Sequence, residues 1–195
     1  MRSILSVIAI VLFAISSSVG QDHCFEDCMD NMKTSTVPFP NKSRVIIQGL
    51  IGCQAPDFEV ETLDSALLKL SDLKGNVVVM NFWFEACPPC IAELPALNRL
   101  AEEYAAEDVV FIAFGRDGEE SIRGFLQETE FIYEHVAIDQ QLIEKYYIVA
   151  GWPTNMVLDK EGVLRQIFSG GPTDERAQTE AYDKMKPTIE EYLNK

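Results

Sequence analysis

The stretch VVVMNFWFEACPPCIAELP, residues 77–95, places two cysteines between a strand-like segment and a helix-like segment. Residues 77–80 form an apolar, Val-rich run, as in a buried strand. Cys87 and Cys90 follow, and residues 91–104 carry apolar side chains at the three- and four-residue spacing of an amphipathic helix. Both sulfurs should therefore lie at a helix N-terminus, where unpaired N–H groups and the helix dipole favour a thiolate. The pattern predicts a redox site.

Two cysteines at this spacing can form a disulfide and reopen it. We expect Cys87 to be the exposed, attacking thiol and Cys90 to be the more buried thiol that resolves a mixed disulfide. A zinc site is an alternative, but it needs a second cysteine pair with suitable spacing. A purely structural disulfide is another, although so small a loop would constrain the unfolded chain little.

The composition is that of an ordinary globular protein. The chain has 195 residues, 47% hydrophobic and 24% charged, which suits one domain with extensions. The formal net charge of −15 argues against a nucleic-acid partner, because phosphate binding needs a basic surface.

Residues 1–20 differ from the rest of the chain. Arg2 is their only charge, residues 4–15 are almost wholly apolar, and residues 18–20 read Ser-Val-Gly, a small-x-small cleavage signal. The pattern predicts a secretory signal peptide, with an uncleaved N-terminal anchor as the alternative. We therefore expect a periplasmic or other extracytoplasmic location, where disulfides persist.

Residues 21–47 read as a polar extension without sustained periodicity, and they contain Cys24 and Cys28. All five cysteines follow the signal segment, so at least one is free or pairs with another molecule. A local disulfide, or one to Cys53, is expected for this pair, and electron exchange with the main pair is a further possibility. A soft-metal site for Cu(I) is an alternative, with these candidate ligands: His23, Cys24, Cys28, Met29 and Met32.

Residues 48–195 read as one domain in which strands and helices alternate before a final hairpin and helix. Strands are expected at residues 45–51, 57–61, 67–70, 109–114, 135–138, 155–158 and 163–168, with hairpins joining the second to the third and the last two. Helices are expected at residues 121–129 and 140–147, a capped turn at 71–75, and a last helix from Thr173 or Asp174 to Leu193. Pro95 should kink the helix that follows the cysteines. The order predicts an α/β fold: a mixed central sheet flanked by helices, with an N-terminal β-hairpin.

Several motifs occur in order: Ala55-Pro56-Asp57-Phe58, Asn81-Phe82-Trp83, Cys87-Pro88-Pro89-Cys90, Glu93-Leu94-Pro95 and Gly151-Trp152-Pro153-Thr154. Together they resemble the thioredoxin fold, and more narrowly the TlpA/ResA group of exported thiol–disulfide oxidoreductases. The resemblance covers residues 48–194, most of the chain after the signal segment.

The resemblance implies roles for individual residues. Cys87 matches the family's nucleophile and Cys90 its resolving cysteine. Pro153 matches a cis-proline beside the disulfide, whose neighbouring backbone can pair with a substrate strand. Glu93 matches an acidic position that tunes the cysteines, unless it is only a surface carboxylate. The expected substrate-binding residues are Trp83, Trp152 and Pro153.

Two positions depart from the family pattern. Asn81 stands where thioredoxins place a buried aspartate, so the usual proton acceptor is missing, and Glu93 could replace it if the fold buries it. Trp152 stands where smaller residues are usual. It could shield the disulfide, form an aromatic docking surface, or only pack.

The residues around the cysteines favour a reducing role. Pro88 and Pro89 have no N–H to donate to a Cys87 thiolate, and Glu85 and Glu93 add negative charge nearby. Both effects raise the thiol pKa and oppose the helix dipole. We expect protein thiols and disulfides as substrates, an extracytoplasmic electron partner and no cofactor.

Two other functions remain as alternatives. A peroxiredoxin-like peroxidase needs a threonine three residues before the reactive cysteine, and this chain has Phe84 there. A copper-handling module would use Cys87 and Cys90, or the N-terminal ligands. Sco-like carriers have a C-x3-C motif and a distal histidine instead, and His135 reads as an ordinary surface or core side chain.

Overall fold

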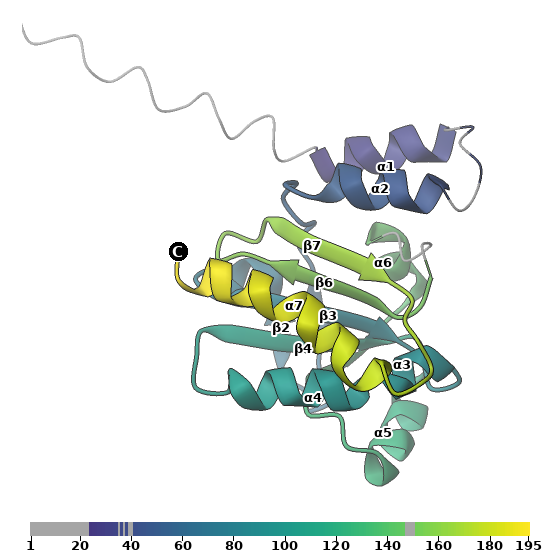
Figure 1. The fold of residues 1–195 in the computed structure, drawn as a ribbon, viewed down its shortest axis with the longest axis vertical. Coiled ribbons are helices and arrows are strands. Elements are labelled where there is room, and N and C mark those ends of the chain that lie inside the picture. The colour runs from purple at the N-terminus through teal and green to yellow at the C-terminus, as the bar shows by residue number, and fades with distance from the viewer. Residues whose placement is uncertain (1–23, 35, 37, 39–40, 147–150) are drawn as a thin grey trace, which may run out of the picture.

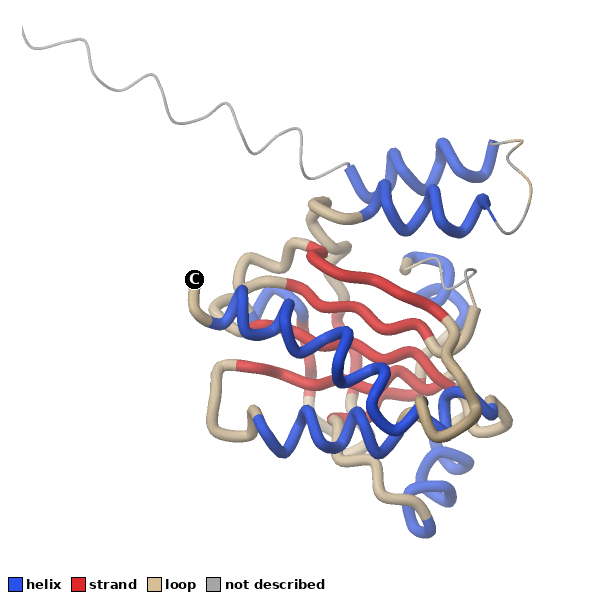
Figure 2. Tube along the Cα trace, viewed as in Figure 1, coloured by secondary structure: helices blue, strands red, loops and turns tan. Residues whose placement is uncertain are grey.

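A five-stranded mixed sheet forms the centre of the protein (Figures 1 and 2). The computed structural model describes residues 24–34, 36, 38, 41–146 and 151–195. The strands are β3 Val77–Trp83, β4 Val109–Gly115, β5 Glu134–Ala137, β6 Thr154–Leu158 and β7 Leu164–Ser169. Their order in the sheet is β5-β4-β3-β6-β7; β3, β4 and β5 pair in parallel, whereas β6 is antiparallel to β3 and to β7.

The central strand β3 supplies side chains to both cores of the protein. All of its residues are buried, and alternate side chains point to opposite faces of the sheet. Met80 and Phe82 pack into one core, whereas Val79 and Trp83 pack into the other. A strand that is buried on both faces explains the continuous apolar run in the sequence.

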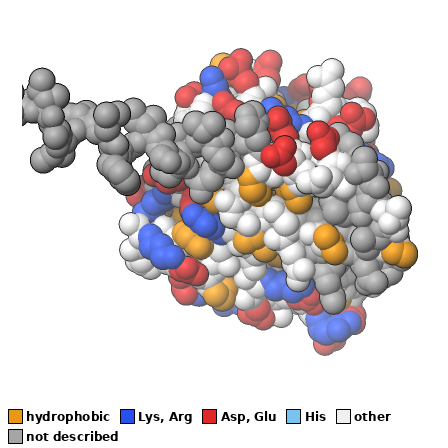
Figure 3. Space-filling view, turned by 90° about the horizontal axis from the view of Figure 1, so that it is seen from above, with side chains coloured by type: hydrophobic (Ala, Val, Ile, Leu, Met, Phe, Trp, Pro, Cys, Tyr) orange, Lys and Arg blue, Asp and Glu red, His pale blue; other side chains and the backbone are white. Residues whose placement is uncertain are grey.

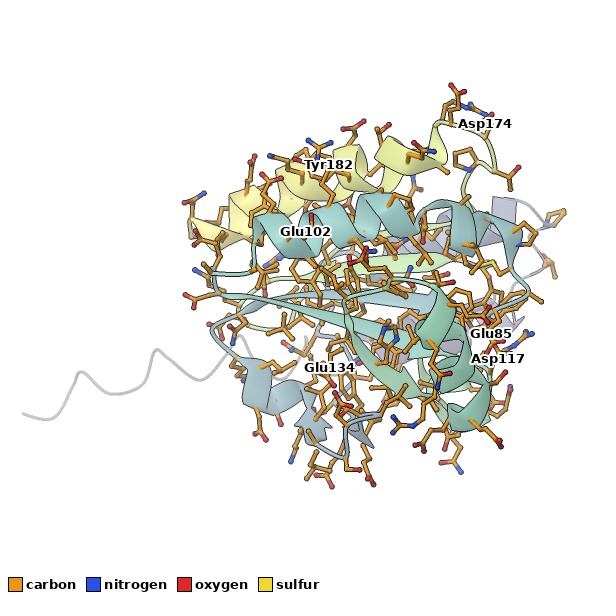
Figure 4. The ribbon with its side chains drawn as sticks, turned by 90° about the horizontal axis from the view of Figure 1, so that it is seen from below. Glu85, Glu102, Asp117, Glu134, Asp174 and Tyr182 are labelled. Carbon is orange, nitrogen blue, oxygen red and sulfur yellow. A yellow bond between two sulfur atoms is a disulfide. The ribbon has the colours of Figure 1, made fainter. Side chains whose placement is uncertain are left out.

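Helices cover the sheet, as the sequence predicts. They are α3 Pro88–Ala92, α4 Leu94–Glu103, α5 Glu119–Glu128, α6 Gln140–Lys145 and α7 Ala177–Leu193. On one face α4 and α7 lie side by side (Figures 2 and 4), and the Arg99 guanidinium of α4 lies 3.8 Å from the centre of the Tyr182 ring of α7.

Pro95 interrupts the helix after the cysteines, as predicted. Helix α3 ends at Ala92, Glu93 lies between the two helices, and α4 begins at Leu94. Pro95 therefore occupies the first turn of α4, where its missing N–H is not needed for a helical hydrogen bond.

Both predicted hairpins are present. Strands β1 Glu59–Glu61 and β2 Leu67–Lys69 form a separate two-stranded antiparallel sheet, followed by a short 3₁₀ helix, η1 Leu70–Leu73. The second hairpin is β6–β7, paired from Thr154 opposite Ser169 to Leu158 opposite Leu164.

The strand predicted at residues 45–51 is wrong, and the extension is helical. Helices α1 Cys24–Thr34 and α2 Asn41–Leu50 pack against each other on the β7 side of the sheet (Figure 1). Ile47 and Leu50 face the core, whereas Val45 is 46% exposed. A three-residue interval between inward positions fits a helix, because a strand would bury every second residue.

A disulfide ties this helical pair to the domain. Cys24 is bonded to Cys53, which selects one of the pairings that the sequence left open, and Cys28 is a half-buried free thiol. A Cβ atom at Gly49 would lie 2.7 Å from the Cys28 sulfur, so a larger residue there would require the Cys28 side chain to move. The alternative of an N-terminal copper site is wrong in its stated ligands, because the sulfur of Cys24, one of those ligands, is oxidised in the disulfide. His23 and the predicted signal peptide lie outside the described residues.

The last helix begins later than predicted. Helix α7 starts at Ala177 with Arg176 at its N-cap position, and no side chain caps it. The Asp174 carboxylate instead accepts a hydrogen bond from the Arg176 backbone N–H at 3.1 Å, and it also binds the Arg176 guanidinium. In the part of the chain that the structure describes, none of the helices combines the length and apolarity needed to cross a bilayer.

The surface is strongly charged. In Figure 3, hydrophobic side chains form small separate patches between acidic and basic ones. The large hydrophobic side chains that stay exposed are few among the described residues: Val45, Ile51, Leu67 and Ile132.

We expect the Cys24–Cys53 disulfide to stabilise the protein without affecting the chemistry at Cys87. It closes a loop of 29 residues, for which loop entropy gives about 3–4 kcal/mol. Urea unfolding of the double variant Cys24→Ala/Cys28→Ala should show a loss of this size. Cys28→Ala alone is the matched control and should stay close to wild type. Equal stabilities of the two variants would contradict the prediction.

Candidate active site

The Cys87–Cys90 disulfide lies directly after β3 at the start of α3. Its Cα atoms are 5.3 Å apart, and the Cys90 backbone N–H points at the Cys87 sulfur, 3.3 Å away. Cys87 is the N-cap residue of α3, and Pro88 and Pro89 form the first turn. Because these prolines lack an N–H, the first backbone donor available to the Cys87 sulfur is that of Cys90.

The prediction that Cys87 is exposed is wrong for this oxidised state. Cys87 is 2% exposed and Cys90 is 1% exposed. Both sulfurs belong to the core on the α4–α7 side of the sheet, against which the half-buried rings of Phe84 and Trp152 also pack. A substrate must therefore approach past these rings, or Cys87 must become more exposed when it is reduced.

The Trp152–Pro153 peptide bond is cis, as the resemblance implied. Thr154 pairs with Phe82 across β6 and β3, so Pro153 lies beside the end of β3 that leads to the cysteines. The Pro153 carbonyl accepts hydrogen bonds from the Gly170 N–H at 2.7 Å and the Ser169 hydroxyl at 3.0 Å. The turn is thereby fixed to β7.

The predicted substrate-binding role of Trp83 does not fit its position. Its side chain is 0% exposed and packs against the rings of Phe125 and Phe131. A docked protein cannot reach it, because the end of a central strand directs it into the core. We therefore treat Trp83 as a core residue.

Trp152 forms an aromatic and cationic cluster with Phe84 and Arg116, in which the two rings are half-buried and Arg116 is exposed. The Phe84 and Trp152 ring centres are 5.6 Å apart in an edge-to-face arrangement. The Arg116 guanidinium lies 4.2 Å from the Phe84 ring centre and 5.4 Å from that of Trp152. Cation–π attraction holds such a group in place. Arg116 could not be predicted from the sequence, because only the tertiary fold brings the end of β4 beside these rings.

Glu93 is a buried carboxylate clamped by two amides. It is 4% exposed, which excludes the surface position considered as an alternative. The Asn81 side-chain N–H donates to Glu93 Oε1 at 2.9 Å, and that of Asn155 donates to Oε1 at 3.2 Å and Oε2 at 3.3 Å. The Asn81 amide also donates to Asn155 Oδ1 at 2.9 Å. The role of Asn155 was not predicted from the sequence, although an amide at the start of an apolar strand was a usable signal.

Burial controls the protonation of this carboxyl group. Desolvation raises the pKa of Glu93 from 4.5 to about 7, although the hydrogen bonds from Asn155 and Asn81 partly oppose the shift. The group therefore exchanges its proton near neutral pH, a useful range for a proton acceptor in thiol chemistry. Glu93 is three residues after Cys90, at the C-cap of α3.

A pair of acidic residues connects the loops after β3 and β4. Glu85 and Asp117 follow β3 and β4, and Figure 4 places their side chains close together. The Glu85 backbone N–H donates to the Asp117 carboxylate at 2.7 Å. Glu85, one of the two acidic residues predicted near Cys87, thus lies in the loop that leads to it, and Asp117 adds a carboxylate that was not predicted.

His135 is a core side chain, one of the two positions that the sequence left open. It is buried, its Nε2 lies 2.8 Å from the Phe131 carbonyl oxygen, and burial lowers its pKa. Among the residues that the structure describes, His, Cys, Asp and Glu side chains form no group of three or more that could hold a metal ion.

Comparisons with known proteins agree with this geometry. The model of the AhpC/TSA family matches residues 51–167. The chain belongs to this family. The thioredoxin-like protein YneN of Bacillus subtilis is 37% identical over 125 residues, which cover 63% of this chain and 73% of that protein. The thiol-disulfide oxidoreductase ResA of Bacillus cereus is 32% identical over 148 residues, which cover 74% and 78%.

The fold is also found in a solved structure from Chlorobium tepidum, described as a thiol:disulfide interchange protein DsbE. It superimposes with a TM-score of 0.64 at 24% identity over 73% of this chain and 97% of that one. The predicted thioredoxin-like fold and the TlpA/ResA-like resemblance are confirmed. With the disulfide at the start of α3, they identify the chain as a thiol–disulfide oxidoreductase.

Glu93 should make stability depend on pH. Its pKa is higher in the folded protein than the ordinary 4.5, so its contribution is fully present below about pH 4.5 and is lost as the pH rises through about 7. We expect Glu93→Gln to be more stable than wild type at pH 8, by at most about 3 kcal/mol, with the difference shrinking towards pH 4.5. Urea unfolding at both pH values measures it. An advantage that is equal at both would contradict the prediction.

Proposed function

We propose that this thiol–disulfide oxidoreductase is exported and acts mainly as a reductant of disulfides in other proteins, through Cys87 and Cys90. The observation that carries the proposal is a disulfide at a helix N-terminus, beside a cis-proline and a buried carboxylate. Cys87, Cys90, Glu93 and Pro153 are the proposed catalytic residues, and Trp152 and Pro153 the proposed substrate-binding residues.

The reduced protein would begin the reaction with a thiolate at Cys87. This thiolate attacks one sulfur of a substrate disulfide, whose S–S bond breaks, and the other substrate sulfur leaves as a thiolate and takes up a proton. The Cys90 thiol then gives its proton to the Glu93 carboxylate and attacks the Cys87 sulfur. The mixed disulfide breaks and the second substrate thiolate leaves. Two electrons have passed to the substrate, and the Cys87–Cys90 disulfide remains.

The electrostatics at the cysteines support the reducing direction. An oxidising site stabilises the reduced thiolate, whereas here Pro88 and Pro89 offer no N–H, and Glu85 and Glu93 carry carboxylates. The single backbone donor to the Cys87 sulfur is that of Cys90, at 3.3 Å, among the described residues. A protein electron donor would have to restore the dithiol after each cycle.

Two features support export. Residues 1–20 have the pattern of a signal peptide. The Cys24–Cys53 disulfide, away from the active site, is of a kind that persists in extracytoplasmic compartments.

The peroxidase alternative is less favoured. The position three residues before Cys87 is Phe84, whose ring lies against Arg116 and Trp152. No hydroxyl is available there to position a peroxide. For the copper alternative, the described His, Cys, Asp and Glu side chains form no group of three or more that could hold a metal ion.

Insulin reduction with dithiothreitol tests the activity. Wild type should accelerate it, and Cys87→Ser should reduce the rate to that of dithiothreitol alone, because the attacking sulfur is gone. Cys28→Ser is the matched control and should keep the wild-type rate. Equal rates for wild type and Cys87→Ser would overturn the proposed function.

The reduction potential of the Cys87–Cys90 pair tests the direction. We expect a value nearer to that of thioredoxin, about −270 mV, than to that of a strong oxidant, about −120 mV. Equilibration with glutathione or dithiothreitol buffers measures it. A value at the oxidising end would reverse the proposed direction.

Trp152→Ala tests the docking surface. Loss of the ring should raise KM for a protein disulfide about tenfold, with a smaller change in kcat, because contact area is lost but the cysteines are not. Trp152→Phe should retain most of the affinity. A KM unchanged in Trp152→Ala would show that this ring only packs.

A further inference from the structure

The two amides around Glu93 do more than satisfy the hydrogen-bonding capacity of a buried carboxylate. Asn155 contacts both carboxylate oxygens, and its own Oδ1 accepts the hydrogen bond that orients the Asn81 amide. Asn155 therefore fixes two members of the cluster, the carboxylate and the second amide.

The position of Asn155 connects this cluster to the docking turn. Asn155 lies directly opposite Asn81 in the β3–β6 register and two residues after the cis-proline Pro153. The turn with the proposed substrate-pairing backbone thus leads directly into the strand that carries the side chain holding Glu93.

The charged groups near Glu93 have largely offsetting effects on it, so the amides are the main partners whose removal would change its pKa. From α7, Lys184 favours the carboxylate and Glu180 disfavours it, but these two are paired with each other at 2.5 Å, so their effects on Glu93 largely offset. From the segment before β5, Tyr133 is fully buried and its pKa is raised well above 10, so it stays neutral. Cys87 and Cys90 carry no charge while they are disulfide-bonded.

The Asn81 amide has one hydrogen-bond acceptor without a donor among the described residues. Its buried Oδ1 has no hydrogen-bond partner among the described residues. A protonated Glu93 carboxyl would supply a donor in this cluster, whereas the carboxylate has only acceptors. Protonation of Glu93 would therefore add a donor to a cluster that contains an unpaired acceptor among the described residues.

We propose that Asn155 is a positioning residue for the disulfide exchange: its amide holds the Glu93 carboxylate in the orientation from which it accepts the proton of the Cys90 thiol. The inference rests on the proposed role of Glu93 in the second step. In that step the S–H bond of Cys90 breaks, Glu93 takes the proton, and the Cys90 sulfur displaces the leaving thiolate from Cys87.

The reaction of the reduced protein with one equivalent of 5,5′-dithiobis(2-nitrobenzoate) isolates this step. Attack by Cys87 releases the first thionitrobenzoate, and attack by Cys90 on the mixed disulfide releases the second. In Asn155→Leu the carboxylate loses its bidentate donor and is protonated more easily. We expect the pH midpoint of the second phase to move up by about one unit, and its rate at pH 7 to fall about fivefold. The first phase should change little.

Three controls show whether the effect of Asn155 acts through Glu93. In a Glu93→Gln background, Asn155→Leu should add no further shift in the pH midpoint, because no carboxyl group remains to be held. Asn76→Ala, which removes an amide at the opposite end of β3, should match wild type. Circular dichroism checks folding, and Asn155→Ser replaces Asn155→Leu if the latter does not fold.

An unchanged pH midpoint in the Asn155 variant would overturn the inference, and so would an equal shift in the Glu93→Gln background. The small disulfide needs no protein substrate. A wild type that shows both phases but does not reduce insulin would therefore refute the proposed function and leave the inference on Asn155 standing.

Discussion

The central strand β3 is buried on both faces, and the active site depends on this constraint. Its side chains are divided between two cores, so the strand cannot shift without disturbing both of them. The disulfide follows directly from its end, and the neighbouring β6 brings the cis-proline alongside. The rigidity of the sheet is what holds Cys87, Cys90 and Pro153 in a common place.

The same strand places a polar side chain, Asn81, in the core. A buried amide must be hydrogen-bonded, and its partners are Glu93 of the helical break and Asn155 of β6. Three elements of the fold thus meet in one polar cluster beside the cysteines. The cost of burying the carboxylate raises its pKa into the neutral range, so a feature that lowers stability at high pH is the one that suits proton exchange with a thiol.

The N-terminal helices are attached to the domain by packing and by a covalent bond. They meet the domain beside β7, and the Cys24–Cys53 disulfide connects them covalently. They pack beside β7, whereas the exchange chemistry lies after the C-terminal end of β3. The separation makes the two disulfides distinguishable by mutation.

The sequence by itself determined the order of strands and helices in the domain, the break at Pro95 and the cysteine pair, because local periodicity and Pro placement encode these features. It missed the helices of the extension, where few apolar residues marked the inward face, and it placed a strand at residues 45–51. Only the tertiary structure decided that Cys24 pairs with Cys53, that Trp83 and Cys87 are buried, and that Arg116 joins the rings of Phe84 and Trp152. It alone brought Asn155 to Glu93, because strand register and packing set which distant side chains meet, and burial then sets their chemistry.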